Sequence, residues 1–182
     1  METMRHSLAI IGLGNEMLSD DGLGIRVVRA LRQRLRGRDI EFEELSLGGL
    51  PLLDHLIGFD RCIIVDAIST LMHPPGTMLH FTQCGPSAPV AIRSSHQIDL
   101  SQILGLAELL GERLPRQVTV YGIEACDVTT FHDECTHAVA EAIPSLVEAI
   151  CRDIDEERFS APPGQWEVID PVVEQRHAME HL

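Results

Sequence analysis

Residues 7–24 read SLAIIGLGNEMLSDDGLG, and this stretch decides the fold class. Its first six residues form a short apolar run that glycine ends, which is typical of a strand buried in a sheet. A polar loop follows, and apolar residues then recur at helical spacing from Val27 to Leu35, which predicts an amphipathic helix. A buried strand, a loop and a helix in this order favour an α/β protein.

The rest of the chain continues this alternation of strands and helices. The expected strands cover residues 40–43, 62–67, 77–82 and 118–123. The expected helices cover residues 51–57, 97–110 and 133–155, the last with a kink at Pro144. We therefore expect an α/β three-layer sandwich, in which helices flank a twisted, mostly parallel central sheet of about five strands.

The chain has 182 residues, of which 45% are apolar and 23% charged, as in an ordinary globular domain. We expect residues 1–154 to form a single α/β domain. From residue 155 to 182 seven acidic residues accompany two arginines, and prolines are interspersed. Because such a composition does not support a core, we expect an acidic, flexible C-terminal tail whose removal leaves the domain folded.

Charge and cysteine content exclude several classes of function. All 14 basic residues are arginine, and the net charge is −14, which argues against nucleic acid as a partner. Without lysine there is no Schiff-base catalyst and no Walker-type phosphate lysine. Five widely spaced cysteines argue against a disulfide framework, and no apolar run reaches 18 residues. We therefore expect a cytoplasmic protein with reduced thiols and no membrane insertion.

The loop after the first strand does not fit a dinucleotide site. The fingerprint G-x-G-x-x-G requires glycine at position 17, where this chain has Met17. The acidic residues Glu16, Asp20 and Asp21 would also repel a pyrophosphate. We expect Asp20 or Asp21 to cap the following helix, since aspartate often accepts the free N–H groups of a helix start.

Two further polar residues are expected at the same edge of the sheet as Glu16. Asp66 follows the buried run of residues 62–65, and His96 precedes a predicted helix. Sites in open α/β sheets lie at the carboxyl ends of the strands. Two carboxylates and an imidazole suit a divalent ion such as nickel or zinc. Glu16, Asp66 and His96 are therefore the candidate metal ligands, although as ordinary loop residues each could be structural.

Motifs across the chain resemble the nickel–iron hydrogenase maturation proteases. They are Gly12-x-Gly14-Asn15-Glu16 followed by Asp20-Asp21-Gly22-x-Gly24, then Gly48-Gly49-Leu50, Val65-Asp66-Ala67, Ser95-His96 and Gly122-Ile123-Glu124. The resemblance covers residues 8 to about 152, and the first motif is specific. Ala125 departs from the pattern, because many members have proline there.

The resemblance implies an endopeptidase that removes the C-terminal extension of a hydrogenase large-subunit precursor after nickel insertion. It also implies a twisted, mostly parallel sheet and a site in which Glu16, Asp66 and His96 contact the metal and act in catalysis. We expect the nickel-loaded precursor to supply the metal, because this donor set would hold a free ion weakly. Metal-activated water and a carboxylate base both remain open as the source of hydrolysis.

Other interpretations remain beside this one. The same three residues would suit a nickel chaperone or sensor without proteolytic activity. The opening Gly12-Leu-Gly14-Asn15 also resembles peptidyl-tRNA hydrolases, although the acidic charge disfavours tRNA. Cys126, Asp127 and the cluster His132–His137 could hold zinc, although the spacing on a helix is poor. Neither H-E-x-x-H nor G-x-S-x-G occurs. Six arginines at 26–38 are expected on a solvated helix face.

Overall fold

The computed structural model describes residues 8–46, 49–83, 91–92, 98–156 and 166–169. Six strands form one mixed sheet in the order β2-β1-β3-β7-β4-β8. The strands are β1 (Leu8–Leu13), β2 (Ile40–Leu45), β3 (Arg61–Ile68), β4 (Met78–Gln83), β7 (Gln117–Glu124) and β8 (Trp166–Val168). The first four in the sheet order are parallel, whereas β4 runs antiparallel to both β7 and β8. The prediction of a mostly parallel central sheet is thus confirmed.

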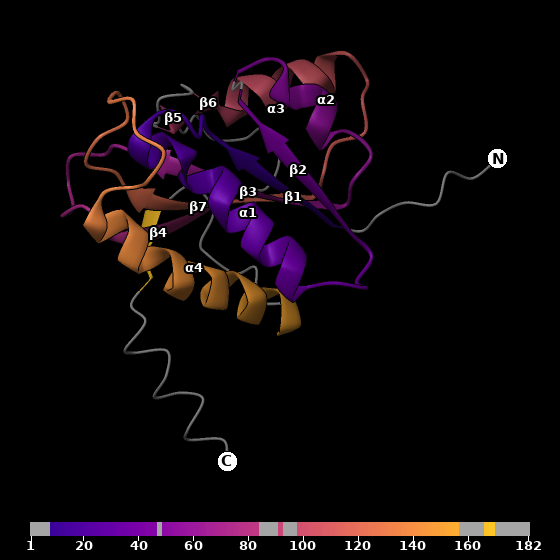
Figure 1. The fold of residues 1–182 in the computed structure, drawn as a ribbon. Coiled ribbons are helices and arrows are strands. Elements are labelled where there is room, and N and C mark those ends of the chain that lie inside the picture. The colour runs from indigo at the N-terminus through magenta and orange to yellow at the C-terminus, as the bar shows by residue number, and fades with distance from the viewer. Residues whose placement is uncertain (1–7, 47–48, 84–90, 93–97, 157–165, 170–182) are drawn as a thin grey trace.

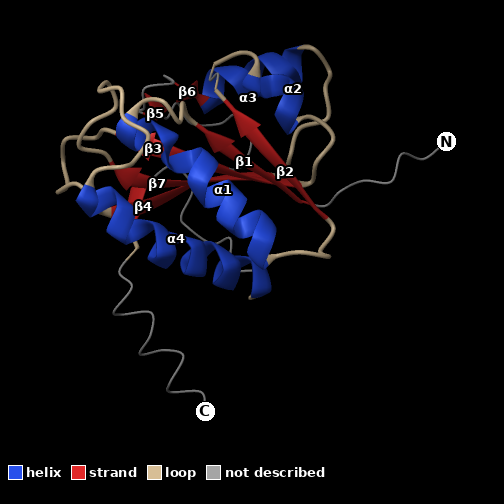
Figure 2. Ribbon diagram, viewed as in Figure 1, coloured by secondary structure: helices blue, strands red, loops and turns tan. Residues whose placement is uncertain are grey.

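Helices cover both faces of the sheet, as Figures 1 and 2 show. On one face lie α1 (Leu23–Arg34) and α4 (His137–Asp155), and on the other lie α2 (Leu52–Leu56) and α3 (Leu100–Leu109). A short 3-10 helix, η1 (Ser19–Gly22), precedes α1, and a two-stranded ribbon is formed by β5 (Ala91–Ile92) and β6 (Ile98–Asp99). None of the helices among the described residues has the length and apolar character needed to cross a membrane.

The strand pattern divides the core into two apolar layers. Along β3, Ile63 and Val65 pack with α1 and α4, while Ile64 and Ile68 pack with α2 and α3. Successive side chains of a strand point to opposite faces, which explains this alternation. Nearly continuous apolar runs are therefore what a strand covered on both faces requires. Asp66 has the same parity as Ile64, so its side chain belongs to the α2 and α3 face.

Two expected boundaries differ from the structure. The last helix begins at His137 rather than near residue 133, because the preceding loop is held by bonds to the first loop. Within the segment expected as a flexible tail, Trp166–Val168 pairs with β4, and Ile169 is buried in the α1 and α4 layer. This short strand completes the hydrogen bonding along the outer edge of β4, which accounts for its order. The rest of the tail lies outside the described residues, so its flexibility stays a prediction.

Candidate functional site

A fully buried carboxylate joins the loops that follow β1 and β7. Asp20, in η1, accepts hydrogen bonds from the backbone N–H groups of Cys126 and Asp127, both at 2.9 Å, through Oδ2. The same oxygen accepts the hydroxyl of Thr136 at 3.0 Å, and Oδ1 accepts the Thr136 N–H at 2.6 Å. Bonds from neutral donors to a carboxylate are strong, so Asp20 fixes the two loops together at the carboxyl edge of the sheet.

The predicted capping of α1 by Asp20 or Asp21 is wrong. Gly22 occupies the cap position of α1, and no side chain caps the helix there. Asp20 is occupied by donors more than 100 residues away, and Asp21 accepts the Asn15 N–H at 2.9 Å. Both aspartates lie within η1, which leads into α1 through Gly22, so neither of them occupies the cap position.

The carbonyl group of Asp21 lies against Gly14, the residue that follows β1. At Gly14, where φ is +149°, a Cβ would overlap the carbonyl oxygen of Asp21. At Gly24, a Cβ would overlap the carbonyl oxygens of Leu13 and Val65, the residue before Asp66. Only glycine permits backbones to approach so closely. The first motif therefore brings the turn with Asp21 down onto the strand that carries Asp66.

Asp66 and Glu124 are buried acidic residues on neighbouring strands. Asp66 has no exposed surface and pairs in register with Gly122 of β7. Glu124, two residues on, is 2% exposed and accepts hydrogen bonds from the Thr70 hydroxyl at 2.6 Å and the Leu71 N–H at 2.8 Å. Asp66 was expected at the end of its strand, but β3 continues to Ile68, so Asp66 is held by the sheet rather than by a loop.

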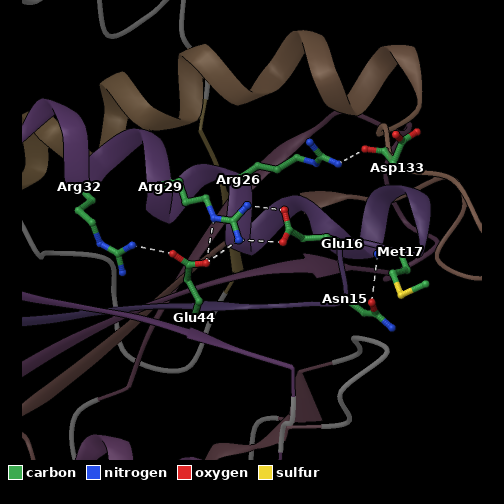
Figure 3. A network of polar contacts seen from close by, with 8 residues as sticks. All are labelled: Asn15, Glu16, Met17, Arg26, Arg29, Arg32, Glu44 and Asp133. Carbon is green, nitrogen blue, oxygen red and sulfur yellow. Dashed lines mark hydrogen bonds and ion pairs between the residues drawn. The ribbon is translucent and has the colours of Figure 1, made fainter.

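Glu16 lies in a network on the α1 side of the molecule, as Figure 3 shows. Both of its oxygens accept hydrogen bonds from Arg29, at 2.5 and 2.8 Å. Arg29 also contacts Glu44, which Arg32 contacts in turn. Burial disfavours the charge on Glu44, yet the hydrogen bonds from both arginines outweigh it and lower its pKa. Bonds from Glu44 and Glu16 raise the pKa of Arg29.

The assembly of Glu16, Asp66 and His96 into one metal site stays a prediction. Glu16 turns toward α1, whereas the side chain of Asp66 belongs to the face that α2 and α3 cover. His96 lies outside the described residues, so its position relative to Asp66 stays a prediction. Among the residues that the structure describes, no group of three His, Cys, Asp or Glu side chains is arranged to hold a metal ion.

The rival zinc cluster does not form either. Cys126 is exposed, while Cys135 is half-buried and donates from its thiol to the carbonyl of Ser19 at 3.6 Å. Burial raises the pKa of the Cys135 thiol, which disfavours the thiolate that zinc requires. His132 contacts the backbone of Glu134 instead of a metal-ligating side chain. These residues shape the loop before α4.

The arginine-rich helix is confirmed as a solvated, ion-paired face. Arg34 contacts Glu148 and Arg38 contacts Asp155, both on α4, and these side chains are about half exposed. Arg26 donates to the carbonyl oxygen of Asp133. Acidic residues of α4, β2 and the first loop therefore neutralise the arginines that the local sequence leaves without an acidic neighbour.

The described residues form an α/β fold in which buried acidic side chains lie near the carboxyl edge of a mostly parallel sheet, the edge where sites of open α/β folds are found. Residues 25–153 match the hydrogenase maturation protease family, and the chain belongs to this family. It is therefore a protease of the class that processes hydrogenases.

Individual relatives agree with this assignment. The chain is 32% identical over 160 residues to hydrogenase 2 maturation protease of Escherichia coli K12, covering 87% of this chain and 96% of that protein. Its fold matches the hydrogenase maturating endopeptidase HybD from E. coli with a TM-score of 0.68 at 27% identity, over 91% of this chain and 97% of that one. HybD from Thermococcus kodakarensis matches with a TM-score of 0.58 at 27% identity, over 82% and 98% of the two chains.

Proposed function

We propose that this protease removes the C-terminal extension of a nickel–iron hydrogenase large-subunit precursor after nickel has been inserted, and that it recognises the nickel held by that precursor. The observation that carries the proposal is Asp66, a fully buried aspartate near the carboxyl end of a central strand in a member of this family. Buried carboxylates are expensive to maintain and are retained where they meet a cation or a proton in function.

The metal-recognising set consists of Asp66, His96 and a carboxylate of the first loop. The resemblance implies Glu16 for the third position. Two observations favour Asp21 instead: η1, which contains Asp21, contacts β3, the strand that carries Asp66, and Asp21 is 2% exposed. Glu16 would have to leave a bidentate contact with Arg29 to join Asp66.

This arrangement suits a metal that arrives with the substrate. A nearby cation stabilises the charged form of a buried carboxylate, so Asp66 gains from the approach of a precursor that already holds nickel. The precursor's own thiolates would supply the soft ligands that this chain's oxygen and imidazole donors lack. A nickel-free precursor carries no such cation, so its approach would not stabilise the charged form of Asp66. The protease would thus discriminate between loaded and empty precursor, and purified protein should contain little stoichiometric metal.

Mass spectrometry of the processed large subunit tests this function. Purified protease is incubated with nickel-loaded precursor and, in parallel, with nickel-free precursor. Loaded precursor should lose its C-terminal extension, and empty precursor should remain intact. Equal cleavage of both forms, together with tightly bound metal in the protease, would make the protein an ordinary metalloprotease. Binding of nickel without any cleavage would support the chaperone or sensor alternative.

Isosteric variants identify the first-loop carboxylate. Asp21→Asn and Asp66→Asn retain the size of the side chain and one acceptor oxygen but remove the charge, and each should abolish processing while the protein stays folded. Glu16→Gln is the matched control, and it should process precursor at nearly the wild-type rate. Loss of processing in Glu16→Gln with normal processing in Asp21→Asn would reverse this assignment. His96→Gln tests the imidazole in the same assay.

A further inference from the structure

Four of the eight large apolar side chains that are exposed among the described residues lie on the loops that follow β1, β3 and β7. Met17 follows β1, Leu71 and Met72 follow β3, and Phe131 follows β7, with exposed fractions of 63%, 84%, 78% and 76%. We call these four residues the apolar rim. Large exposed apolar patches on soluble proteins often mark binding surfaces.

Backbone pairing holds one half of the rim in place. The His132 N–H donates to the carbonyl of Met17 at 3.1 Å, and the Ser19 N–H donates to the carbonyl of His132 at 2.8 Å. Leu18 forms an antiparallel bridge with Phe131. The first loop and the loop after β7 therefore run side by side and present Met17 and Phe131 on neighbouring segments.

A buried glutamate holds the other half. Glu124 accepts hydrogen bonds from Thr70 and from the N–H of Leu71, whose φ of +60° is unusual for a large side chain. The Thr70 hydroxyl also accepts the N–H of Met72 at 3.2 Å. The fold thus maintains an unfavourable backbone conformation that places two large apolar side chains in solvent. Strain of this kind persists where function requires the geometry.

Both halves flank the proposed site. Asp20 bonds to the N–H groups of Cys126 and Asp127, which directly follow Glu124 and Ala125, and Asp20 itself precedes Asp21. The turn that contains Asp21 is therefore bonded to the loop that carries Phe131. The same loop follows Glu124 of β7, which bonds to the N–H of Leu71. Leu71 and Met72 follow the strand that carries Asp66, so a large molecule that approaches the carboxyl end of this strand meets the rim.

We infer that the apolar rim is the docking surface for an apolar surface of the protein substrate next to its cleaved segment, which rests on the proposed function. The net charge of the chain favours a protein partner over a second copy of the chain or an anionic membrane. The chain carries −14, so a second copy meeting it face to face and an anionic membrane surface are both repelled, whereas an apolar protein surface is not. Docking through the rim would let the protease bind a folded precursor as well as the metal and the peptide.

Two double variants test this, Leu71→Asn with Met72→Gln, and Met17→Gln with Phe131→Gln. Asparagine suits position 71 because it adopts positive φ readily. The control is Leu109→Gln with Leu110→Gln, since both leucines are exposed but lie at the end of α3, on the segment leading to the amino end of β7. All three proteins should retain the wild-type unfolding midpoint, because they change exposed side chains.

Affinity for nickel-loaded precursor is measured by calorimetry in an Asp66→Asn background, so that no cleavage intervenes, and kcat and KM are measured in the active background. Each rim variant should weaken the Kd at least tenfold and raise KM with little change in kcat, whereas the control should match wild type. Unchanged Kd in both rim variants would overturn the inference. Weaker binding by the rim variants in a protein that never cleaves precursor would overturn only the proposed function.

Two other occupants are tested with the same variants. Sedimentation velocity over a range of concentrations would show a dimer of this chain, and flotation with phosphatidylcholine vesicles would show binding to a membrane. We expect a single monomeric species and no vesicle binding. A dimer, or a vesicle complex, that forms in wild type and disappears in the rim variants would assign the rim to that occupant and overturn docking of the substrate.

Discussion

Replacing Asp20 with alanine should be among the most destabilising single changes in the described part of the chain. The carboxylate is fully buried and accepts four hydrogen bonds, from the N–H groups of Cys126, Asp127 and Thr136 and from the Thr136 hydroxyl. Alanine removes every one of these acceptors. The donors belong to the loop before α4, which cannot follow the shortened side chain without losing its other bonds to η1, such as that from Ser19 to His132.

The size of the effect can be worked from these contacts. A hydrogen bond to a charged group contributes about 1.5–3 kcal/mol, so four would sum to roughly 6–12 kcal/mol if they were independent. They are not independent, and water can reach a loop in which Cys126 is exposed. Loss of a buried, hydrogen-bonded charge typically costs about 3–5 kcal/mol, and we expect a value in this range. For a chain of this size that corresponds to a fall in Tm of roughly 6–20 °C.

Asparagine at position 20 provides an intermediate case. Its single oxygen can occupy the place of Oδ2, which accepts three of the four bonds, and only the bond from the Thr136 N–H to Oδ1 is lost. We expect Asp20→Asn to cost about 1.5–3 kcal/mol. The matched control is Asp133→Ala, an exposed aspartate of the same loop, which should change stability by less than about 0.5 kcal/mol.

Urea unfolding followed by far-ultraviolet circular dichroism measures the three variants at pH 7, with the slope m checked for two-state behaviour. The reasoning predicts the order alanine, asparagine, control, from most to least destabilised. If Asp20→Ala lost less than about 1 kcal/mol, the four contacts would not tie the two loops together. The assignment of the loop after β7 to the same rigid unit as η1 would then be wrong.

Three further outcomes are expected. Truncation after Glu156 removes β8 and the buried Ile169 and should cost at least about 1.5–3 kcal/mol, whereas truncation after Asp170 should leave the urea midpoint unchanged. Burial, with a smaller contribution from Glu43, raises the pKa of Cys62 from 9.0 to about 12. The contribution of this thiol to the free energy of unfolding is therefore full below pH 9 and is lost as the pH rises toward 12. In urea midpoints taken between pH 8 and 11, Cys62→Ala should reduce this loss of stability. Arg29→Ala should cost less than about 1 kcal/mol, since its ion pairs are exposed, and a larger loss by thermal unfolding would show that the network stabilises the first loop.

The sheet and its helices were predictable because their signals are local. The apolar run that ends at Gly12 and the helical spacing from Val27 to Leu35 each report burial of a single element. The short strand β8 was not predictable from its acidic, proline-rich surroundings. It is ordered by the free edge of β4, a partner more than 80 residues away in the sequence. Tertiary pairing of this kind overrides a weak local pattern.

The candidate site was predicted only in part, for a similar reason. Position alone placed Asp66 correctly on a central strand near the carboxyl edge of the sheet. The direction of the Glu16 side chain was not predictable, because it is set by a contact with Arg29 of α1, which Glu44 of β2 also contacts. The capping role expected for Asp20 failed because its donors lie 106 to 116 residues further on. Loop side chains take their direction from whichever donors the fold brings near them.

The three acidic residues of the first loop therefore divide into three roles that their types alone do not distinguish. Glu16 is half exposed and pairs with an arginine, so its charge is balanced at the surface. Asp20 is balanced by backbone donors, which makes it a structural tie between loops. Asp21 accepts the Asn15 N–H, and its carbonyl group lies against Gly14, which follows β1. Each of the three acidic residues is therefore held by a different kind of partner, and the Asp21→Asn and Glu16→Gln variants decide which of them acts with Asp66.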